Sequence, residues 1–327
     1  MKPSELALKL NHSIKTHTPQ FITGEPGVGK SRIAQQVAEA AGYQYRDIRA
    51  SLTDPVDWRG IPSVKNGRTT WNPPDFLPSE ADGPTVLMLD ELNLAPQSVQ
   101  SACYSLIQQG IIGDYRLPET CIRWAAGNGD ADRCNTNRMS RALDSRFQWA
   151  TLEPNLDDWC QWALSAGIET EIIAFLRFRP GLLHQFDPKA TEKSYPCPRT
   201  WEMTSRSLPG LPPAIQFDEI AGTVGSGAAS EFVGFLRICQ ECPNPDAVLL
   251  NPQSADVPTS PATLYALTGA LAHRASANNA ERLFAYAERL PAEFSVLMVR
   301  DSLQIAPDIT NTRAFNGWAV SHADVLI

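Results

Sequence analysis

Histidine, paired cysteines and clusters of basic residues are scarce in this 327-residue chain, and their scarcity excludes several classes of protein. Five histidines and seven scattered cysteines leave little material for a metal centre or a disulfide framework. Lysine and arginine together number 28 against 36 aspartates and glutamates, which gives a formal net charge of −8. Because non-specific DNA binding depends on basic residues that neutralise phosphates, this balance argues against a nucleic-acid partner.

Long apolar runs are also missing. Every helix-forming apolar segment is interrupted well short of the length that spans a bilayer, and no apolar signal core follows the start of the sequence at Met1. We therefore expect a cytoplasmic protein with no membrane partner.

What the sequence does contain is a phosphate-binding loop. An apolar strand at 21–23 precedes it, and a helical pattern that begins at Arg32 follows it. The motif G-x-x-x-x-G-K-[ST] is filled by Gly24, Glu25, Pro26, Gly27, Val28, Gly29, Lys30 and Ser31. Glycines let consecutive backbone N–H groups point at one anion, and the helix N-terminus adds partial positive charge. The sequence thus predicts a nucleotide site over residues 24–32, Arg32 included, in which Lys30 reaches the β- and γ-phosphates and Ser31 binds Mg²⁺.

Strand patterns alternate with helical patterns through the first half of the chain. The strands are expected at 21–23, 43–49, 85–91, 121–126 and 147–152. Such alternation predicts an α/β core with a five-stranded parallel sheet over residues 1–153. Breaker residues and the dipeptide Asn66–Gly67 predict an insertion with a small hairpin at about 52–83.

The second half reads as helical. Strand signals fade after residue 153, and helical periodicity predicts an all-α domain over 154–239. Residues 240–261 hold five prolines and are expected to be a linker or extended loop. A helical C-terminal extension completes the chain, so that the linker and extension together occupy 240–327.

Polar residues end two of the apolar strands. Asp90 is suited to hold Mg²⁺ through a bound water, and Glu91 is suited to activate the attacking water. The alternative is that both acids cap the next helix. Asn128 ends the following strand, where an amide can hold the attacking water and contact the γ-phosphate; alternatively it is a turn asparagine between two glycines.

Arginines supply the remaining candidates. Arg138, Arg141 and Arg146 precede the fifth strand, and at a subunit edge one of them could enter a neighbour's site as an arginine finger. We expect Arg146 in that role, with Arg141 as the alternative and salt bridging to Asp144 as the ordinary structural explanation. Arg199 begins a helix, where the helix dipole disfavours a cation. We therefore expect Arg199 to contact the γ-phosphate and report hydrolysis.

Together these motifs resemble those of the AAA+ ATPases, specifically the MoxR-like branch near the dynein-related group. The resemblance spans roughly residues 3–210. Its matching pieces are 24–31 (Walker A), 86–91 (Walker B) followed by Asn93 and Ala95–Pro96, Asn128 (sensor 1), 143–147 (the arginine-finger segment) and 198–200 (sensor 2). Leu94 departs from the family, which commonly has arginine after the Walker B asparagine.

The resemblance implies a hexameric ring that binds ATP between protomers, closes the site with the all-α domain as a lid, and presents the insertion to the axial face or pore. It also implies chaperone-like remodelling of a protein client, often with a von Willebrand factor A domain partner. A nucleic-acid-associated motor or restriction-type translocase is the alternative, kept open by Lys65 and Arg68 at the hairpin tip. A nucleotide switch without hydrolysis is a third reading, against which Glu91 and Asn128 argue. The chain lacks the Asn-Lys-x-Asp guanine-reading motif, which favours ATP over GTP.

Overall fold

The computed structural model describes residues 1–129 and 139–322, which form two compact units, Met1–Asn155 and Leu156–Ile327. Each unit is described by itself below. Among the described residues, no helix combines the length and the apolar character that crossing a membrane requires.

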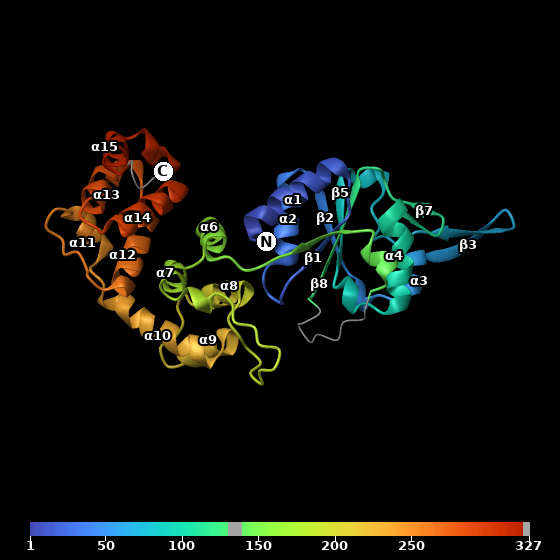
Figure 1. The fold of residues 1–327 in the computed structure, drawn as a ribbon, viewed down its shortest axis with the longest axis horizontal. Helices are drawn as coiled ribbons and strands as arrows, with labels where there is room; N and C mark the ends of the chain where they lie inside the picture. Colours follow the sequence, from blue (N-terminus) through green and yellow to red (C-terminus); the bar gives the residue numbers. More distant parts are fainter. Residues whose placement is uncertain (130–138, 323–327) are drawn as a thin grey trace. The chain divides into compact units, whose positions relative to one another are not determined.

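A five-stranded parallel sheet forms the centre of the first unit (Figure 1). In chain order its strands are β1 (Gln20–Thr23), β2 (Gln44–Arg49), β5 (Thr85–Asp90), β8 (Cys121–Gly127) and β9 (Gln148–Thr151). In space the order is β2-β5-β8-β1-β9. The predicted α/β class with its five-stranded parallel sheet is therefore confirmed.

The strand register brings the functional segments together. Asp90 pairs with Arg49 of β2, and Thr23, which directly precedes the phosphate-binding loop, pairs with Gly127 of β8. Because parallel strands end at the same edge, the loop after β1, the carboxylates after β5 and the amide after β8 all lie at one edge of the sheet.

The two faces of the sheet explain why its central strands are apolar throughout. In β5, Leu87 and Leu89 belong to one hydrophobic cluster, while Val86 and Met88 belong to the cluster on the other face. Side chains alternate between faces along a strand, so a strand buried on both sides reads as an unbroken apolar run. Each fully buried Leu, Val or Met contributes roughly 1.5–3 kcal/mol.

Helices cover both faces. On one face α1 (Pro3–Thr16) and α2 (Lys30–Ala40) contribute buried residues to the cluster that contains Val86, and on the other α4 (Gln97–Gln109) contributes to the cluster that contains Leu87. These layers are visible in Figure 1. A short helix, α5 (Arg141–Asp144), precedes β9 and is capped by the Ser140 hydroxyl, which accepts a hydrogen bond from Leu143 N at 3.2 Å.

The insertion between β2 and β5 contains the predicted hairpin. It includes α3 (Pro55–Arg59), β3 (Ile61–Lys65) and β4 (Arg68–Asn72), and the antiparallel pair turns at Asn66–Gly67, both with positive φ. Trp58 is fully buried and anchors the base of the insertion. Its indole N–H donates to Thr53 Oγ1 at 2.9 Å. Figure 1 shows the hairpin extending beyond the sheet.

The first unit also has a small second hairpin that periodicity does not predict. Its strands, β6 (Ile111–Ile112) and β7 (Tyr115–Arg116), have two residues each. Such short strands carry no detectable alternation, so only the intervening turn residues could have suggested them.

The second unit is entirely helical among its described residues. Its first helices are α6 (Leu156–Ala166), α7 (Thr170–Phe178), α8 (Pro198–Ser207), α9 (Gln216–Val224) and α10 (Ser226–Glu241). They surround a hydrophobic cluster in which Phe175 packs against Trp201 and Phe232, with ring centroids 5.6 Å and 5.0 Å away.

The later helices surround a second cluster that includes Trp318 and Leu267. They are α11 (Pro245–Leu250), α12 (Pro261–His273), α13 (Ala280–Ala287), α14 (Ala292–Ile305) and α15 (Arg313–Ser321). Helix α11 lies inside the segment expected to be extended. It forms because Pro245 occupies the first helical turn, where proline is tolerated, and the Asn244 side chain accepts from Asp246 N at 2.9 Å.

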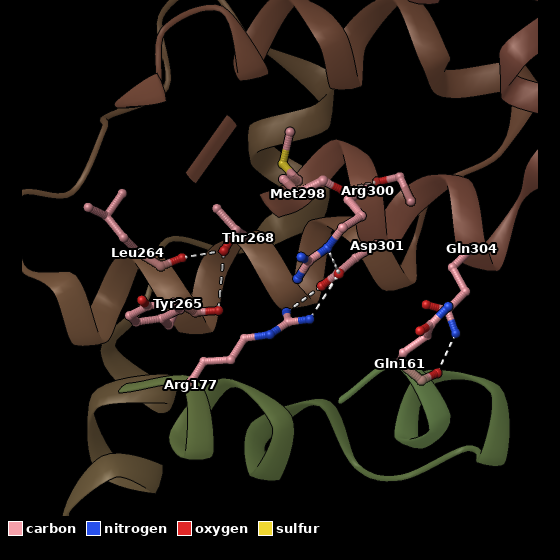
Figure 2. A network of polar contacts seen from close by, with 10 residues as sticks. Gln161, Arg177, Leu264, Tyr265, Thr268, Met298, Arg300, Asp301 and Gln304 are labelled. Carbon is pink, nitrogen blue, oxygen red and sulfur yellow. Dashed lines mark hydrogen bonds and ion pairs between the residues drawn. The ribbon is translucent and has the colours of Figure 1, made fainter. Parts of the chain in front are cut away.

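A buried ion pair connects the two clusters of the second unit (Figure 2). The Arg177 guanidinium on α7 donates through both terminal nitrogens to the Asp301 carboxylate on α14, with Nη2 2.9 Å from Oδ1. The side chains of Arg177 and Asp301 are 9% and 2% exposed. Gln304 Nε2, one turn further along α14, donates to the Gln161 carbonyl of α6.

Candidate functional site

The phosphate-binding loop joins β1 to α2, as its motif predicts. Gly24 begins the loop with φ 155° and is buried. A Cβ built on Gly24 would lie 2.6 Å from the Leu152 carbonyl oxygen, so no larger residue fits without displacing backbone. The loop ends at Gly29, and α2 begins directly at Lys30.

The Lys30 ammonium lies across this loop. Its Nζ donates to the carbonyl oxygens of Gly24 at 2.6 Å and Glu25 at 3.2 Å, and to Asn128 Oδ1 at 3.2 Å. One cation therefore joins the loop after β1 to the amide after β8, two of the predicted site residues.

Ser31 and Asp90 form the second connection. Ser31 Oγ donates to Asp90 Oδ2 at 2.7 Å, and Asp90 Oδ1 accepts from the backbone N–H of Glu91 at 2.9 Å. Both carboxylate oxygens of Asp90 are thereby oriented at the end of β5. A hydroxyl beside a carboxylate is an oxygen-only donor set of the kind that Mg²⁺ prefers.

Glu91 is held by a residue that the sequence did not single out. Ser51 Oγ, in the turn after β2, donates to Glu91 Oε2 at 2.5 Å. Glu91 itself has φ 56°, in the left-handed region that residues with side chains seldom adopt. The two adjacent carboxylates consequently have different environments: Asp90 contacts the loop helix, and Glu91 contacts the β2 side.

Asn128 is placed by its backbone as well as its side chain. Asn93 Nδ2 donates to the Asn128 carbonyl oxygen at 2.8 Å, while Asn128 Oδ1 accepts from Lys30. The structure therefore brings together the residues predicted from three separate motifs. They are Lys30 and Ser31, Asp90 and Glu91, and Asn128.

The sequence of this region matches a described family. Residues 19–147 match the model of the AAA domain of the dynein-related subfamily. These residues are therefore similar to an AAA domain of that subfamily.

Individual proteins and structures similar to this chain share only part of its sequence. Midasin from Giardia intestinalis is 33% identical over 102 residues, which are 31% of this chain and 2% of that protein. Among solved structures, NtrX from Brucella abortus in complex with ADP is 14% identical with a TM-score of 0.44, over 98% of this chain and 67% of that one. A Thermotoga maritima RuvB mutant is 16% identical with a TM-score of 0.38, over 82% and 80% of the respective chains.

A third carboxylate lies beside Asp90 and Glu91. The Asp47 side chain on β2 is exposed, yet its partial desolvation together with the charges of Asp90 and Glu91 raises its pKa from 3.8 to about 6, against the opposing charge of Arg49. Desolvation, Asp47 and Asp90 likewise raise the pKa of Tyr45, whose hydroxyl donates to the Ser31 carbonyl at 3.2 Å. From the sequence, the alternation of β2 could have predicted that Asp47 lies on the α2 face of the sheet. Its proximity to Asp90 depends on the strand order, which the sequence does not give.

This charge distribution fits a cation. Among the described residues there is no group of three histidine, cysteine or acidic side chains that could hold a metal ion alone. Mg²⁺ in nucleotide sites takes one or two protein ligands and completes its shell with phosphates and water. Ser31 and Asp90 would hold it, and its charge would offset the repulsion from Asp90 and Glu91, which adds to desolvation in raising the pKa of Asp47.

The first unit does not direct Arg146 toward the Lys30–Asp90 group of its own chain. The Arg146 guanidinium lies 3.5 Å from the centroid of the Tyr104 ring on α4, and its Nε donates to Gln108 Oε1 at 2.9 Å. The Arg141 side chain, in contrast, is exposed and makes no hydrogen bond or ion pair within residues 1–129 and 139–322. Arg138 lies outside the described residues.

Two further predicted residues are exposed. Arg32 lies in the first turn of α2, where its side chain donates to Gln35 Oε1 at 3.5 Å. Arg199 occupies the second position of α8 in the second unit and is exposed at the helix N-terminus. Its contact with a γ-phosphate remains a prediction.

Proposed function

We propose that this chain is an AAA+ ATPase that binds Mg-ATP and hydrolyses the phosphoanhydride bond between its β- and γ-phosphates, releasing ADP and inorganic phosphate. One observation carries this proposal: Lys30 contacts Asn128, and the next residue, Ser31, contacts Asp90, so three separate motifs meet at one point. Phosphoryl transfer is catalysed by positioning and electrostatic stabilisation, which require a cation, a metal holder and a water-orienting group at one point.

Each residue then has a distinct task. The backbone amides of 24–31 and the N-terminus of α2 bind the phosphates, and Lys30 neutralises the β- and γ-phosphate oxygens. Ser31 and Asp90 hold Mg²⁺, which supplies further charge neutralisation. Glu91 orients and deprotonates the attacking water, and Asn128 fixes that water and the γ-phosphate from the β8 side.

The domain acts as part of a ring in this proposal, with six protomers as the expected number. Arg146 or Arg141 would complete the site of a neighbouring protomer, since Arg146 packs on Tyr104 and Gln108 of its own chain and Arg141 is exposed. Arg199, exposed on α8, would contact the γ-phosphate and convert hydrolysis into movement of the helical unit.

The ring would remodel or activate a protein client as a MoxR-like ATPase, with a von Willebrand factor A domain protein as the expected partner. The insertion hairpin is the proposed contact. Residues 58–74 contain Arg59, Lys65 and Arg68 and no acidic residue, in a chain whose net charge is −8. Ile61 and Val64 are 73% and 76% exposed on this hairpin. An exposed surface that is both basic and apolar suits an acidic, partly unfolded protein segment.

The same hairpin supports one alternative, a nucleic-acid-associated motor or restriction-type translocase. Trp71 is 36% exposed, and basic residues beside an exposed aromatic ring are also found where single strands bind. The acidic balance of the whole chain weighs against this alternative.

Steady-state turnover of ATP and GTP, with and without Mg²⁺, tests the proposed activity. Wild-type protein should hydrolyse ATP only with Mg²⁺, and Lys30→Ala should abolish both binding and hydrolysis. Glu91→Gln should bind ATP and turn it over very slowly, so it can trap the client for identification from the native host. Equal turnover by wild type and Lys30→Ala would refute ATP hydrolysis at this site, and recovery of nucleic acid instead of protein would favour the motor.

A further inference from the structure

Asn93 is a buried amide that connects two parts of the site. It lies in the 3₁₀ turn Leu92–Leu94, two residues after Glu91, and is 7% exposed. Its Nδ2 donates to the carbonyl oxygen of Asn128 at 2.8 Å. The turn that carries the two carboxylates is therefore tied directly to the turn that carries the site amide.

The Asn93 side chain also packs closely on the residue before Asn128. A Cβ built on Gly127 would lie 2.2 Å from Asn93 Oδ1 and 2.6 Å from its Cγ. On the other side Gly127 pairs in register with Thr23 of β1. The Gly127–Asn128 backbone is thus held between β1 and the Asn93 amide, in a space that only glycine fits.

Among the described residues, only the Nδ2 end of the Asn93 amide is hydrogen-bonded. Asn93 Oδ1 is buried and has no hydrogen-bond partner in the part of the chain that the structure describes. An unpaired buried acceptor is unfavourable, and a leucine of similar volume would avoid it. The favourable contribution of the amide therefore comes from Nδ2, whose acceptor is Asn128.

We propose that Asn93 is a positioning residue for Asn128. By fixing the Asn128 carbonyl, it sets the direction of Oδ1 toward Lys30 and the distance of the amide from the carboxylates of the same turn. The inference rests on the proposed ATP hydrolysis, because the position of Asn128 affects rate only if a γ-phosphate and a water lie there. Loss of Asn93 should lower kcat and leave nucleotide affinity nearly unchanged, since Lys30 keeps its contacts to Gly24 and Glu25.

Two Asn93 variants and a matched control test the proposal in the 327-residue chain. Asn93→Leu removes the donor and keeps the volume, and Asn93→Asp keeps the shape but turns an acceptor toward the Asn128 carbonyl. Gln100→Met is the control, because Gln100 is 4% exposed and its Nε2 also donates to a backbone carbonyl, that of Ala95, at 3.1 Å. Thermal unfolding confirms that each variant is folded before its kinetics are measured.

Both Asn93 variants should lower kcat for ATP at least about tenfold, with the Kd for a non-hydrolysable ATP analogue within about threefold of wild type. Gln100→Met should keep kcat within about twofold. Normal kcat in both Asn93 variants of an active protein overturns the positioning role and leaves the hydrolysis proposal standing. A wild-type protein no more active than Lys30→Ala refutes hydrolysis instead.

Hydrogen exchange supplies a measurement that does not depend on turnover. Amides of 121–129 should exchange faster in Asn93→Leu than in Gln100→Met, because only the former loses the contact to the Asn128 carbonyl. Unchanged exchange across this segment would overturn the proposal even where no hydrolysis is detected.

Discussion

Ser51 and Glu91 are joined by a hydrogen bond in which the Ser51 hydroxyl donates to Glu91 Oε2 at 2.5 Å. The contact connects the turn after β2 to the residue proposed to activate water. Because a carboxylate oxygen that accepts from Ser51 is less available to accept from water, this contact opposes the catalytic role of Glu91.

Removing this hydroxyl should raise the basal rate. We expect Ser51→Ala to increase ATP turnover about threefold. This is less than the rate increase that loss of a full hydrogen bond of ~1 kcal/mol would give, because water replaces the serine hydroxyl. Ser51→Thr, which keeps the donor, is the control. Steady-state turnover without client is the measurement, and a tenfold fall in Ser51→Ala would mean that Ser51 instead holds Glu91 in its productive position.

The arginine-finger assignment can be tested by mixing subunits. Arg146→Ala should bind ATP normally and lose hydrolysis by on the order of 10³-fold. Mixing it with Lys30→Ala protein should restore part of the activity, since some interfaces then combine an intact Lys30 with an intact Arg146 from the neighbour. Coupled-enzyme turnover across mixing ratios gives the readout.

Arg141 is the matched control for this experiment, because it is exposed and lies only five positions before Arg146. Arg141→Ala should retain activity. If Arg141→Ala loses hydrolysis and Arg146→Ala does not, Arg141 is the finger and the packing of Arg146 on Tyr104 is purely structural.

Asp47 should make stability depend on pH. Its pKa is raised from 3.8 to about 6 in the folded chain, so between these values the folded state holds a proton that the unfolded state has released. Stability should therefore decrease as pH rises through this window. Asp47→Asn should exceed wild type by about 1 kcal/mol at pH 8, a value reduced for solvent screening of a partly exposed group, and should match it near pH 4.

Urea unfolding across this pH range measures the Asp47 effect. Adding Mg²⁺ at pH 8 should reduce the extra stability of Asp47→Asn, because a cation at Asp90 offsets the repulsion between the Asp47 carboxylate and those of Asp90 and Glu91. If Asp47→Asn exceeded wild type in stability most strongly at pH 4, the raised pKa of Asp47 would be contradicted.

Removing one partner of the buried Arg177–Asp301 pair should strongly destabilise the fold. Arg177→Met leaves the Asp301 carboxylate buried without its partner and should lower the free energy of unfolding by about 3–5 kcal/mol. The double variant Arg177→Met/Asp301→Leu should recover most of this loss, because it removes the unpaired charge. Thermal and denaturant unfolding provide the measurements.

A surface pair supplies the comparison. Arg274 and Asp246 are 38% and 67% exposed, so Arg274→Met should cost less than about 1 kcal/mol. A double Arg177→Met/Asp301→Leu variant as unstable as the single one would show that packing, rather than charge, determines the loss.

The parts of this fold that local patterns specify could be predicted. The central strands are apolar on both faces, and Asn66–Gly67 specifies its hairpin turn, so the sheet and the insertion are both visible in the sequence. The phosphate-binding loop and Asp90–Glu91 were found for the same reason, since each is a short contiguous motif.

The contacts made by Ser51, Asp47 and Asn93 could not be predicted, because they depend on which strands become neighbours. Ser51 lies 40 residues from Glu91, and only the adjacency of β2 and β5 brings them together. Helix α11 was missed for a different reason. Proline both interrupts helices and begins them, and the Asn244–Pro245 pair here acts as a start signal.

Helix α12 has a consequence for how the second unit acquires its structure. Ala262 on this helix belongs to the cluster around Phe175, while Leu264 and Leu267 belong to the cluster around Trp318. A fragment that ends at residue 239 would expose apolar surface of the first cluster. A fragment that begins at residue 240 would lack Arg177, the ion-pair partner of Asp301. The helices from α6 to α15 should therefore unfold in one cooperative transition, and neither half should be an autonomous folding unit.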